Sequence, residues 1–173
     1  TVAAIQSRER FDSHKLIEEM MLLANIAAAQ TLEAKNYPCM YRLHAPPPLD
    51  KVEALREFLL TLSIKLTRTK DILPKHFNQV LDKVKGSPQE VLVNELTLRS
   101  QSQAVYGPEN IGHFGLALTK YAHFTSPIRR YADLLVHRAL IIALGLGEGG
   151  LGKGEVAKFS SLGDAISLCE RIA

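Results

Sequence analysis

The sequence predicts an α+β fold that is predominantly helical and contains only a few short strands. Two observations support this prediction. Apolar residues recur at helical spacing through most of the chain, whereas strict alternation of apolar and polar residues is confined to short segments. Hydrophobic residues make up 46% of the 173 residues, which is enough for the core of one globular domain or of a large piece of one.

The first predicted helix begins at His14 and ends near Lys35. Asp12 or Ser13 can cap its start, and apolar residues follow at helical spacing. Nearly every residue from 20 to 29 is apolar. We therefore expect this helix to be long and largely buried.

A short strand and a proline connector separate this helix from the next ones. Residues 39–44 alternate as a strand does, and the Ala-Pro-Pro-Pro run at 45–48 forces an extended turn. Three further helices are predicted over 49–63, 73–84 and 88–102, because each has apolar residues at helical spacing and a break at both ends.

The character of the sequence changes after the fourth predicted helix. Two short strands are predicted at 104–106 and 114–118, on either side of a turn-rich segment. A helix opened by Pro127 and closed by Gly145 follows. After a glycine-rich loop, a last helix is expected from Glu155 onward.

Composition and charge exclude several classes of protein. The 21 Lys and Arg against 18 Asp and Glu give a net charge of +3, which is too small to imply a polyanion partner without a local basic site. Cys39 and Cys169 are too few for a disulfide framework and have no partners at metal-ligand spacing. No apolar run is long enough to cross a membrane. We therefore expect a cytoplasmic protein without a membrane partner.

Both ends of the sequence suggest a piece of a longer polypeptide. The chain begins at Thr1 without a charged and apolar leader, and residues 168–173 end in a helical pattern without a cap. We expect a longer parent protein from which this segment is cut. Dimerisation of the isolated segment, in a non-native form, would cover the apolar surface that the cut exposes.

The strongest candidate for a binding site is the segment 125–131. Ser126 is a good helix N-cap and Pro127 a favoured first residue, so Arg129 and Arg130 are expected in the first helical turn. Two cations are unfavourable at the positive end of a helix dipole. Together with the free N–H groups there, however, two guanidinium groups would bind a phosphate.

Asp133 leaves a second interpretation of this segment open. It lies four residues after Arg129 and three after Arg130, so an ordinary surface ion pair could occupy one of the arginines. Aromatic residues are interleaved with the basic ones here, as in proteins that bind single-stranded nucleic acid. Phe124 and Tyr131 are nevertheless each favoured as core residues.

A polar pair on the first predicted helix is a second candidate. Glu18 and Asn25 are seven residues apart and share a helix face. Either Asn25 caps a neighbouring loop and Glu18 is solvated, or Glu18 accepts hydrogen bonds from a sugar hydroxyl or pairs with an active-site arginine. No cluster of carboxylates suited to a divalent ion is present, so the chain carries no complete catalytic apparatus.

Short runs along the whole chain form a set of motifs. Three lie in its last third: HFGLAL at 113–118, YAHFTSPIRRYADL at 121–134 and His137-Arg138. Four lie upstream: HKLIEE at 14–19, LANIAA at 23–28, YRLH at 41–44 and YGPEN at 106–110. This set resembles the signature of the RNase II/RNase R family of exoribonucleases, and it is closer to the RNase R branch.

The resemblance implies that residues 1–173 are the second half, or C-terminal part, of an RNB-type catalytic domain, truncated at both ends. It implies processive 3′-to-5′ hydrolysis of single-stranded RNA to nucleoside 5′-monophosphates by the longer parent, with Mg²⁺ as cofactor. The metal-binding aspartates of the family lie earlier in the domain. The resemblance therefore implies that Mg²⁺ is bound by residues outside this chain and that the chain alone is inactive.

The resemblance also implies roles for individual residues. Arg129 matches the arginine that stabilises the scissile phosphate, and Glu18 matches a glutamate that recognises the RNA end. The RNA-binding residues expected in this chain are Glu18, Asn25, His123, Thr125, Ser126 and Arg130. Two alternatives remain: a noncatalytic RNA-binding protein whose parent has lost the aspartates, and a helical interaction module in which the arginines only form ion pairs.

Overall fold

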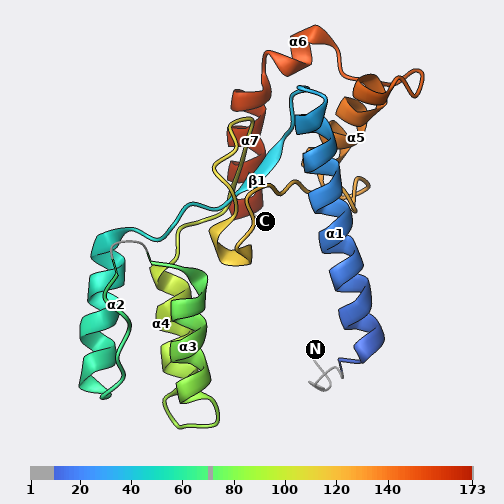
Figure 1. Ribbon diagram of the computed structural model, residues 1–173. Helices are drawn as coiled ribbons and strands as arrows, with labels where there is room; N and C mark the ends of the chain where they lie inside the picture. The colour runs from blue at the N-terminus through green and yellow to red at the C-terminus, as the bar shows by residue number, and fades with distance from the viewer. Residues whose placement is uncertain (1–9, 70–71, 173) are drawn as a thin grey trace, which may run out of the picture.

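The computed structural model describes residues 10–69 and 72–172 and confirms the predominantly helical α+β fold (Figure 1). The four helices predicted before residue 103 are present, each within about two residues of its predicted bounds. The elements follow in the order α1 Asp12–Ala34, β1 Tyr41–Leu43, α2 Leu49–Thr61, α3 Pro74–Val84, α4 Glu90–Ser100, β2 Val105–Gly107, the 3-10 helix η1 Phe114–Leu116, α5 Tyr131–Leu144, α6 Lys153–Val156 and α7 Phe159–Ile172.

The chain folds around two separate apolar cores. Helices α2, α3 and α4 form a three-helix lobe, residues 49–100, which stands apart from the other elements in Figure 1. The lobe core consists of Val52, Leu55, Leu59, Leu66, Ile72, Phe77, Val80, Val84 and Val93. The remaining elements form the main body, whose core includes Leu32, Met40, Leu135, Val136 and Phe159.

A two-stranded antiparallel sheet lies at the centre of the main body. Arg42 of β1 pairs with Tyr106 of β2. Helix α7 packs on β2 at Gly163, where a Cβ atom would lie only 2.5 Å from the carbonyl oxygen of Tyr106. The hydroxyl of Ser167 accepts a hydrogen bond of 2.9 Å from the Tyr106 amide. A glycine and a serine one helical turn apart therefore let this helix approach the strand backbone closely.

The segment 114–118 and the last helix differ from their predictions. Residues 114–118 form no strand: η1 occupies their first part, and Ala117 ends it in the left-handed conformation with φ of 54°. The ring of His44 explains this, because its Nδ1 accepts a 2.9 Å hydrogen bond from the Gly115 amide and holds the chain in a turn. The last helix, predicted from Glu155, is divided into α6 and α7.

Helix α1 is less buried than its apolar sequence predicts. Its buried residues, the first of which is Asn25, all lie in the C-terminal half, which packs near α5. In the N-terminal half, Leu16, Ile17 and Met20 are exposed. Figure 1 shows this half extending away from the other elements, so no described element covers its apolar side chains.

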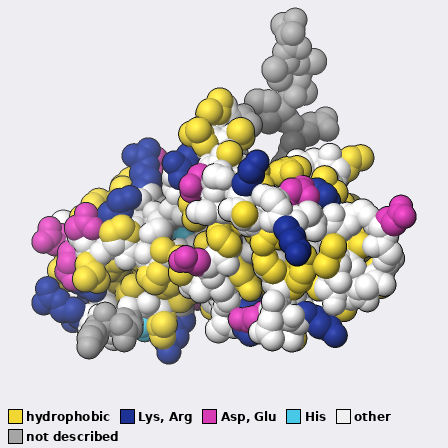
Figure 2. Space-filling model, turned by 90° about the horizontal axis from the view of Figure 1, so that it is seen from above, with side chains coloured by type: hydrophobic (Ala, Val, Ile, Leu, Met, Phe, Trp, Pro, Cys, Tyr) yellow, Lys and Arg dark blue, Asp and Glu magenta, His cyan; other side chains and the backbone are white. Residues whose placement is uncertain are grey.

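The charged side chains are dispersed over the surface. Figure 2 shows Lys and Arg scattered among apolar and acidic side chains on the face seen from above. This agrees with the small net charge of +3, and a basic site on this protein has to be local. Within residues 10–69 and 72–172, no helix is long and apolar enough to cross a membrane.

Candidate functional site

The loop at residues 121–130 carries the candidate site and enters α5 in an unexpected way. Helix α5 begins at Tyr131, with Arg130 as its N-cap, so the prediction that Pro127 opens this helix is wrong. Residues 126–130 form a turn instead, in which the Arg129 and Arg130 amides donate to the carbonyl of Ser126 at 3.3 and 3.2 Å. Neither arginine therefore lies in the first turn of a helix.

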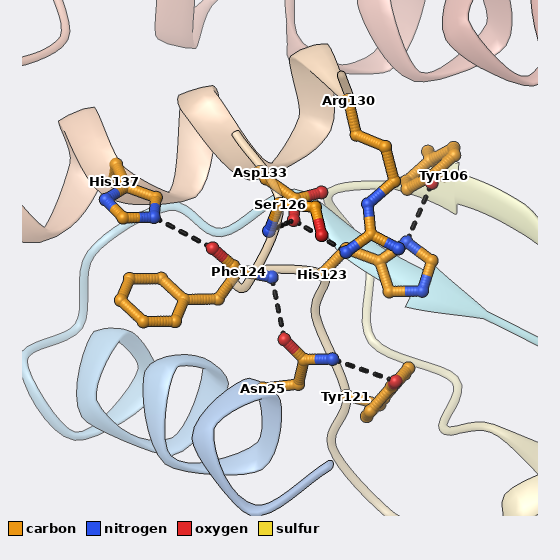
Figure 3. A network of polar contacts seen from close by, with 9 residues as sticks. All are labelled: Asn25, Tyr106, Tyr121, His123, Phe124, Ser126, Arg130, Asp133 and His137. Atoms are coloured by element: carbon orange, nitrogen blue, oxygen red, sulfur yellow. Dashed lines mark hydrogen bonds and ion pairs between the residues drawn. The ribbon is translucent and has the colours of Figure 1, made fainter. Parts of the chain in front are cut away.

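A buried carboxylate explains why the helix starts late. The Oδ2 atom of Asp133 accepts a hydrogen bond of 2.7 Å from the Ser126 amide (Figure 3). This contact draws Ser126 back against the first turn of α5, so the residues between them must bulge out as a separate turn. Ser126 is thus an amide donor to Asp133, and the structure shows no cap formed by its hydroxyl at the start of α5.

Arg129 lies at the exposed edge of this turn. Its neighbour Ile128 is 98% exposed, and Arg129 is exposed as well. Across the two described stretches of chain, the Arg129 side chain makes no hydrogen bond or ion pair. Its guanidinium group is therefore available to an anion from outside the chain.

Arg130 has the opposite surroundings. Its Nη2 atom is 2.8 Å from Oδ2 of Asp133 (Figure 3). The side chain of Arg130 is 20% exposed. Asp133 is fully buried. The alternative of an ion pair at this segment is therefore confirmed for Arg130, although the carboxylate partner is buried rather than at the surface.

Asn25 connects α1 to the same loop. Its side-chain amide donates to the Tyr121 hydroxyl at 3.0 Å, and its Oδ1 accepts from the Phe124 amide at 2.8 Å (Figure 3). Asn25 is 3% exposed, so both contacts lie in the interior. The interpretation that Asn25 caps a neighbouring loop agrees with this geometry.

Glu18 is not part of this network. It is exposed and forms an ion pair with Arg10. Along α1 it lies about 10 Å from Asn25, since a helix rises about 1.5 Å per residue. The structure places Glu18 in the exposed half of α1 and shows no contact between Glu18 and an arginine of the 121–130 loop.

Two histidines hold the loop from other sides. His137 of α5 stacks on the Phe124 ring, with centroids 4.2 Å apart, and its Nε2 donates to the Phe124 carbonyl at 2.8 Å. His123 and the Tyr106 hydroxyl share a hydrogen bond of 2.8 Å. Burial, together with the nearby charge of Arg130, lowers the pKa of His123 from 6.5 to about 4. His123 is therefore neutral at pH 7.

Some buried polar atoms in and beside this loop have no hydrogen-bond partner in the described structure. Two of the loop's buried polar atoms, Thr125 Oγ1 and Arg130 Nε, have no partner among the residues that the structure describes, and neither has Asp133 Oδ1 of α5 beside them. Thr125 is therefore present at the site, but its hydroxyl is directed into the interior.

His137 and Tyr106 are the residues that the sequence prediction missed as parts of this network; Asp133 was predicted only as an ion-pair partner, and its contact with the Ser126 amide was missed. Asp133 and His137 are four residues apart, so they share a face of α5, and this spacing is a signal that could have identified them. Tyr106 approaches from β2, and no local pattern in the sequence indicates that contact.

The described residues offer no metal centre. No three His, Cys, Asp or Glu side chains come together there in a way that could hold an ion. What the loop provides is one exposed guanidinium group on a turn fixed by Asn25, His123, Asp133 and His137. Such a group suits the binding of a phosphate.

Comparison with known proteins shows what this chain resembles. A family model described as the RNB domain matches residues 1–145. Ribonuclease R of Aquifex aeolicus is 47% identical over 98% of this chain and 24% of its own length. The structure of Mycoplasma genitalium RNase R in complex with ribose methylated single-stranded RNA is 26% identical, with a TM-score of 0.82 over 94% of this chain and 26% of that one.

The fold also occurs in a protein described as a pseudonuclease. The structure of yeast Ssd1, a pseudonuclease, matches 93% of this chain and 20% of its own length with a TM-score of 0.75, at 22% identity. A likeness at this identity shows the fold alone. The chain spans about a quarter of the length of Ribonuclease R from Aquifex aeolicus.

Proposed function

The chain belongs to the RNB domain family, whose relatives here are exoribonucleases, and on that premise we propose that it supplies the phosphate-contacting arginine of a longer 3′-to-5′ exoribonuclease. In this proposal the longer protein hydrolyses single-stranded RNA processively to nucleoside 5′-monophosphates. The observation that carries the proposal is Arg129, an exposed guanidinium group without a partner in the described chain, on a turn fixed from several sides.

Arg129 would act on the scissile phosphate, which joins the 3′-terminal nucleotide to the rest of the RNA. A guanidinium group presents parallel N–H donors that match two phosphate oxygens. Negative charge develops on those oxygens during attack on the phosphorus. A donor that is already held in place stabilises this charge in the transition state without having to reorganise. Asn25 connects this loop to α1, and Asp133 and His137 connect it to α5. The backbone that carries Arg129 is therefore held in place.

Mg²⁺, which the family resemblance implies, does not find a ligand set in this part of the protein. Within the described stretches, the carboxylates and histidines do not converge on one point. We propose that residues outside this chain hold the ion and that the 173 residues alone release no nucleotide. Magnesium-dependent release of monophosphates by the purified chain would contradict this.

Replacement of Arg129 in the longer protein tests the proposal. Arg129→Ala is expected to lower kcat on single-stranded RNA by about 100- to 1000-fold, the usual loss when one transition-state donor is removed. RNA affinity should fall less than about tenfold, because one phosphate contact among many is lost. Single-turnover rates and the Kd for RNA, measured at fixed salt, separate the two effects.

Arg99→Ala is a matched control for this experiment. Arg99 is also an exposed arginine, but it lies on α4 in the three-helix lobe and pairs with Glu95 of the same helix. Its loss should leave kcat unchanged. Equal losses of turnover and of affinity in Arg129→Ala would contradict a role for Arg129 in the transition state.

A noncatalytic RNA-binding protein is the second candidate, because the described residues bring together no cluster of metal ligands. In that case the longer protein would bind single-stranded RNA and release no nucleotide. Arg129→Ala would then weaken RNA binding, and there would be no hydrolysis rate for it to affect. The same pair of measurements therefore distinguishes both candidates.

A further inference from the structure

We infer that Arg130 and Asp133 form a positioning pair that orients Arg129, and that Arg130 itself does not contact RNA. This inference rests on the proposed function of Arg129. It assigns different roles to two adjacent arginines: Arg129 contacts the phosphate, and Arg130 holds the turn that carries it. Asp133 connects the two ends of that turn.

One carboxylate oxygen closes the turn. Oδ2 of Asp133 accepts both from the Ser126 amide at 2.7 Å and from Nη2 of Arg130 at 2.8 Å (Figure 3). Ser126 begins the turn and Arg130 ends it, so both of its ends are bound to the same atom. Arg129 lies between them, and its backbone direction depends on this closure.

Burial keeps Arg130 in this pair. Asp133 is fully buried and Arg130 is 20% exposed on its side chain, so neither group is well solvated. Moving Arg130 to a phosphate would leave the Asp133 carboxylate buried without its charged partner, which is strongly unfavourable. Arg129 has no such partner to leave within the described chain. The two arginines therefore differ in their freedom to bind an external anion.

The decisive variant is Asp133→Asn in the longer protein. Asparagine has the size of aspartate and can still accept from the Ser126 amide, but it lacks the charge that holds Arg130. We expect kcat to fall by about 100-fold, the loss that a displacement of about 1 Å causes in an active site. The Kd for single-stranded RNA should change less than about threefold, since no RNA contact is removed.

A double variant shows whether Asp133 acts through Arg129. If it does, Asp133→Asn should have no further effect on turnover once the Arg129 side chain is absent. The double variant Arg129→Ala/Asp133→Asn should then turn over within about twofold of Arg129→Ala alone. A further loss close to 100-fold in the double variant would overturn the inference, because Asp133 would then act independently of Arg129.

Glu155→Gln is the matched control. It removes another carboxylate that pairs with an arginine of α5, Arg138, outside the 121–130 loop. It should leave kcat unchanged, and its thermal unfolding shows how much a lost ion pair alone costs. An equal fall of kcat in both variants would mean that loss of stability, rather than positioning, explains the effect, and would overturn the inference.

Hydrogen exchange provides a readout that needs no nuclease activity. The amides of Ser126, Arg129 and Arg130 are all bonded in the closed turn. Peptides covering 125–131 should exchange faster in Asp133→Asn and at the wild-type rate in Glu155→Gln. Unchanged exchange in Asp133→Asn would overturn the pairing role, whereas failure of the proposed function would appear as unaltered turnover in Arg129→Ala.

Discussion

Arg129 and Arg130 are neighbours in the sequence, yet their surroundings differ in the property that matters for binding. Arg130 is paired with a buried carboxylate, and Arg129 faces solvent on a turn that the pair closes. Identical side chains can therefore perform two tasks, because the turn directs one inward and the other outward. Residue type and spacing alone do not distinguish them, and only the family resemblance gives Arg129 a separate role.

Asn25 is expected to be the most important polar residue of α1 for stability. Asn25→Ala would leave the Phe124 amide and the Tyr121 hydroxyl without their partner in the interior. Each such group costs about 1–3 kcal/mol. Urea denaturation of the 173-residue chain should therefore show a total loss of about 2–6 kcal/mol for the two groups. Asn94→Ala, on the exposed surface of α4, should change stability by less than about 0.5 kcal/mol. Equal effects would contradict the role of Asn25.

Two half-buried histidines, His113 and His123, make stability depend on pH. Burial lowers the pKa of His123 and of His113 from 6.5 to about 4. Between pH 6.5 and 4 the unfolded chain therefore binds protons that the folded chain does not. The free energy of unfolding should fall as the pH falls through this window and should be insensitive to these groups above it.

NMR titration of the imidazole Cε1 protons measures these values directly, and His123→Gln identifies the resonance of His123. Neither His113 nor His123 should titrate above pH 5. An apparent pKa near 6.5 for His123 would show that its ring is solvated, in conflict with its partly buried hydrogen bond to Tyr106.

At the scale of elements, the contact between α7 and β2 fixes the main body around the sheet. Gly163 is the point of closest approach, with Tyr106 and Gly107 backbone atoms where a side chain would lie. Because backbone rather than a flexible side chain blocks this space, a larger residue cannot be accommodated by a change of rotamer.

Gly163→Ala is therefore expected to destabilise the chain by about 1–3 kcal/mol, even though alanine favours a helix. Gly154→Ala in α6 is the control, because no atom lies within 4 Å of a Cβ there. Thermal unfolding should separate the two variants. A Gly163→Ala protein as stable as wild type would show that α7 does not pack on β2 as described.

The helices of the three-helix lobe could be predicted from the sequence because local patterns determine them. Apolar spacing and breaks at both ends place α2, α3 and α4 within about two residues of their observed bounds. The family motif similarly led to the 121–130 loop. Both inferences depend on residues that are close together in the chain.

The start of α5, the conformation of 114–118 and the exposure of α1 could not be predicted in this way. The Ser126 amide is held by Asp133, and the turn at Gly115 depends on His44, which is 71 residues away. Local preference favours a helix at Ser126-Pro127 and a strand at 114–118. A buried side-chain contact overrides it in the first case and a contact distant in sequence in the second. The exposure of α1 depends on which elements lie beside it, and apolar periodicity does not contain that information.

At the scale of the whole molecule, the three-helix lobe is nearly independent of the main body. All buried members of its core lie between Val52 and Val93. Phe77 of the lobe meets Phe114 of the main body edge to face at 6.2 Å. Just after the lobe, the Ser102 carbonyl accepts a hydrogen bond of 2.7 Å from His44 Nε2.

We therefore predict that residues 46–104 fold on their own, with the low stability usual for a domain of about 60 residues. Circular dichroism should show helices and a cooperative thermal transition. Leu59→Ala, in the core, should abolish the transition by removing about 2–5 kcal/mol, whereas Leu60→Ala, half exposed beside it, should retain it. A segment without cooperative unfolding would contradict the independence of the lobe.

A crystal structure of the longer protein with a single-stranded RNA that it cannot hydrolyse tests the central claim most directly. The account predicts that Arg129 nitrogens lie roughly 3 Å from oxygens of the phosphate at the RNA 3′ end, with Arg130 still paired to Asp133. If Arg130 instead leaves Asp133 to hold the phosphate while Arg129 stays in solvent, the roles assigned to both arginines are wrong.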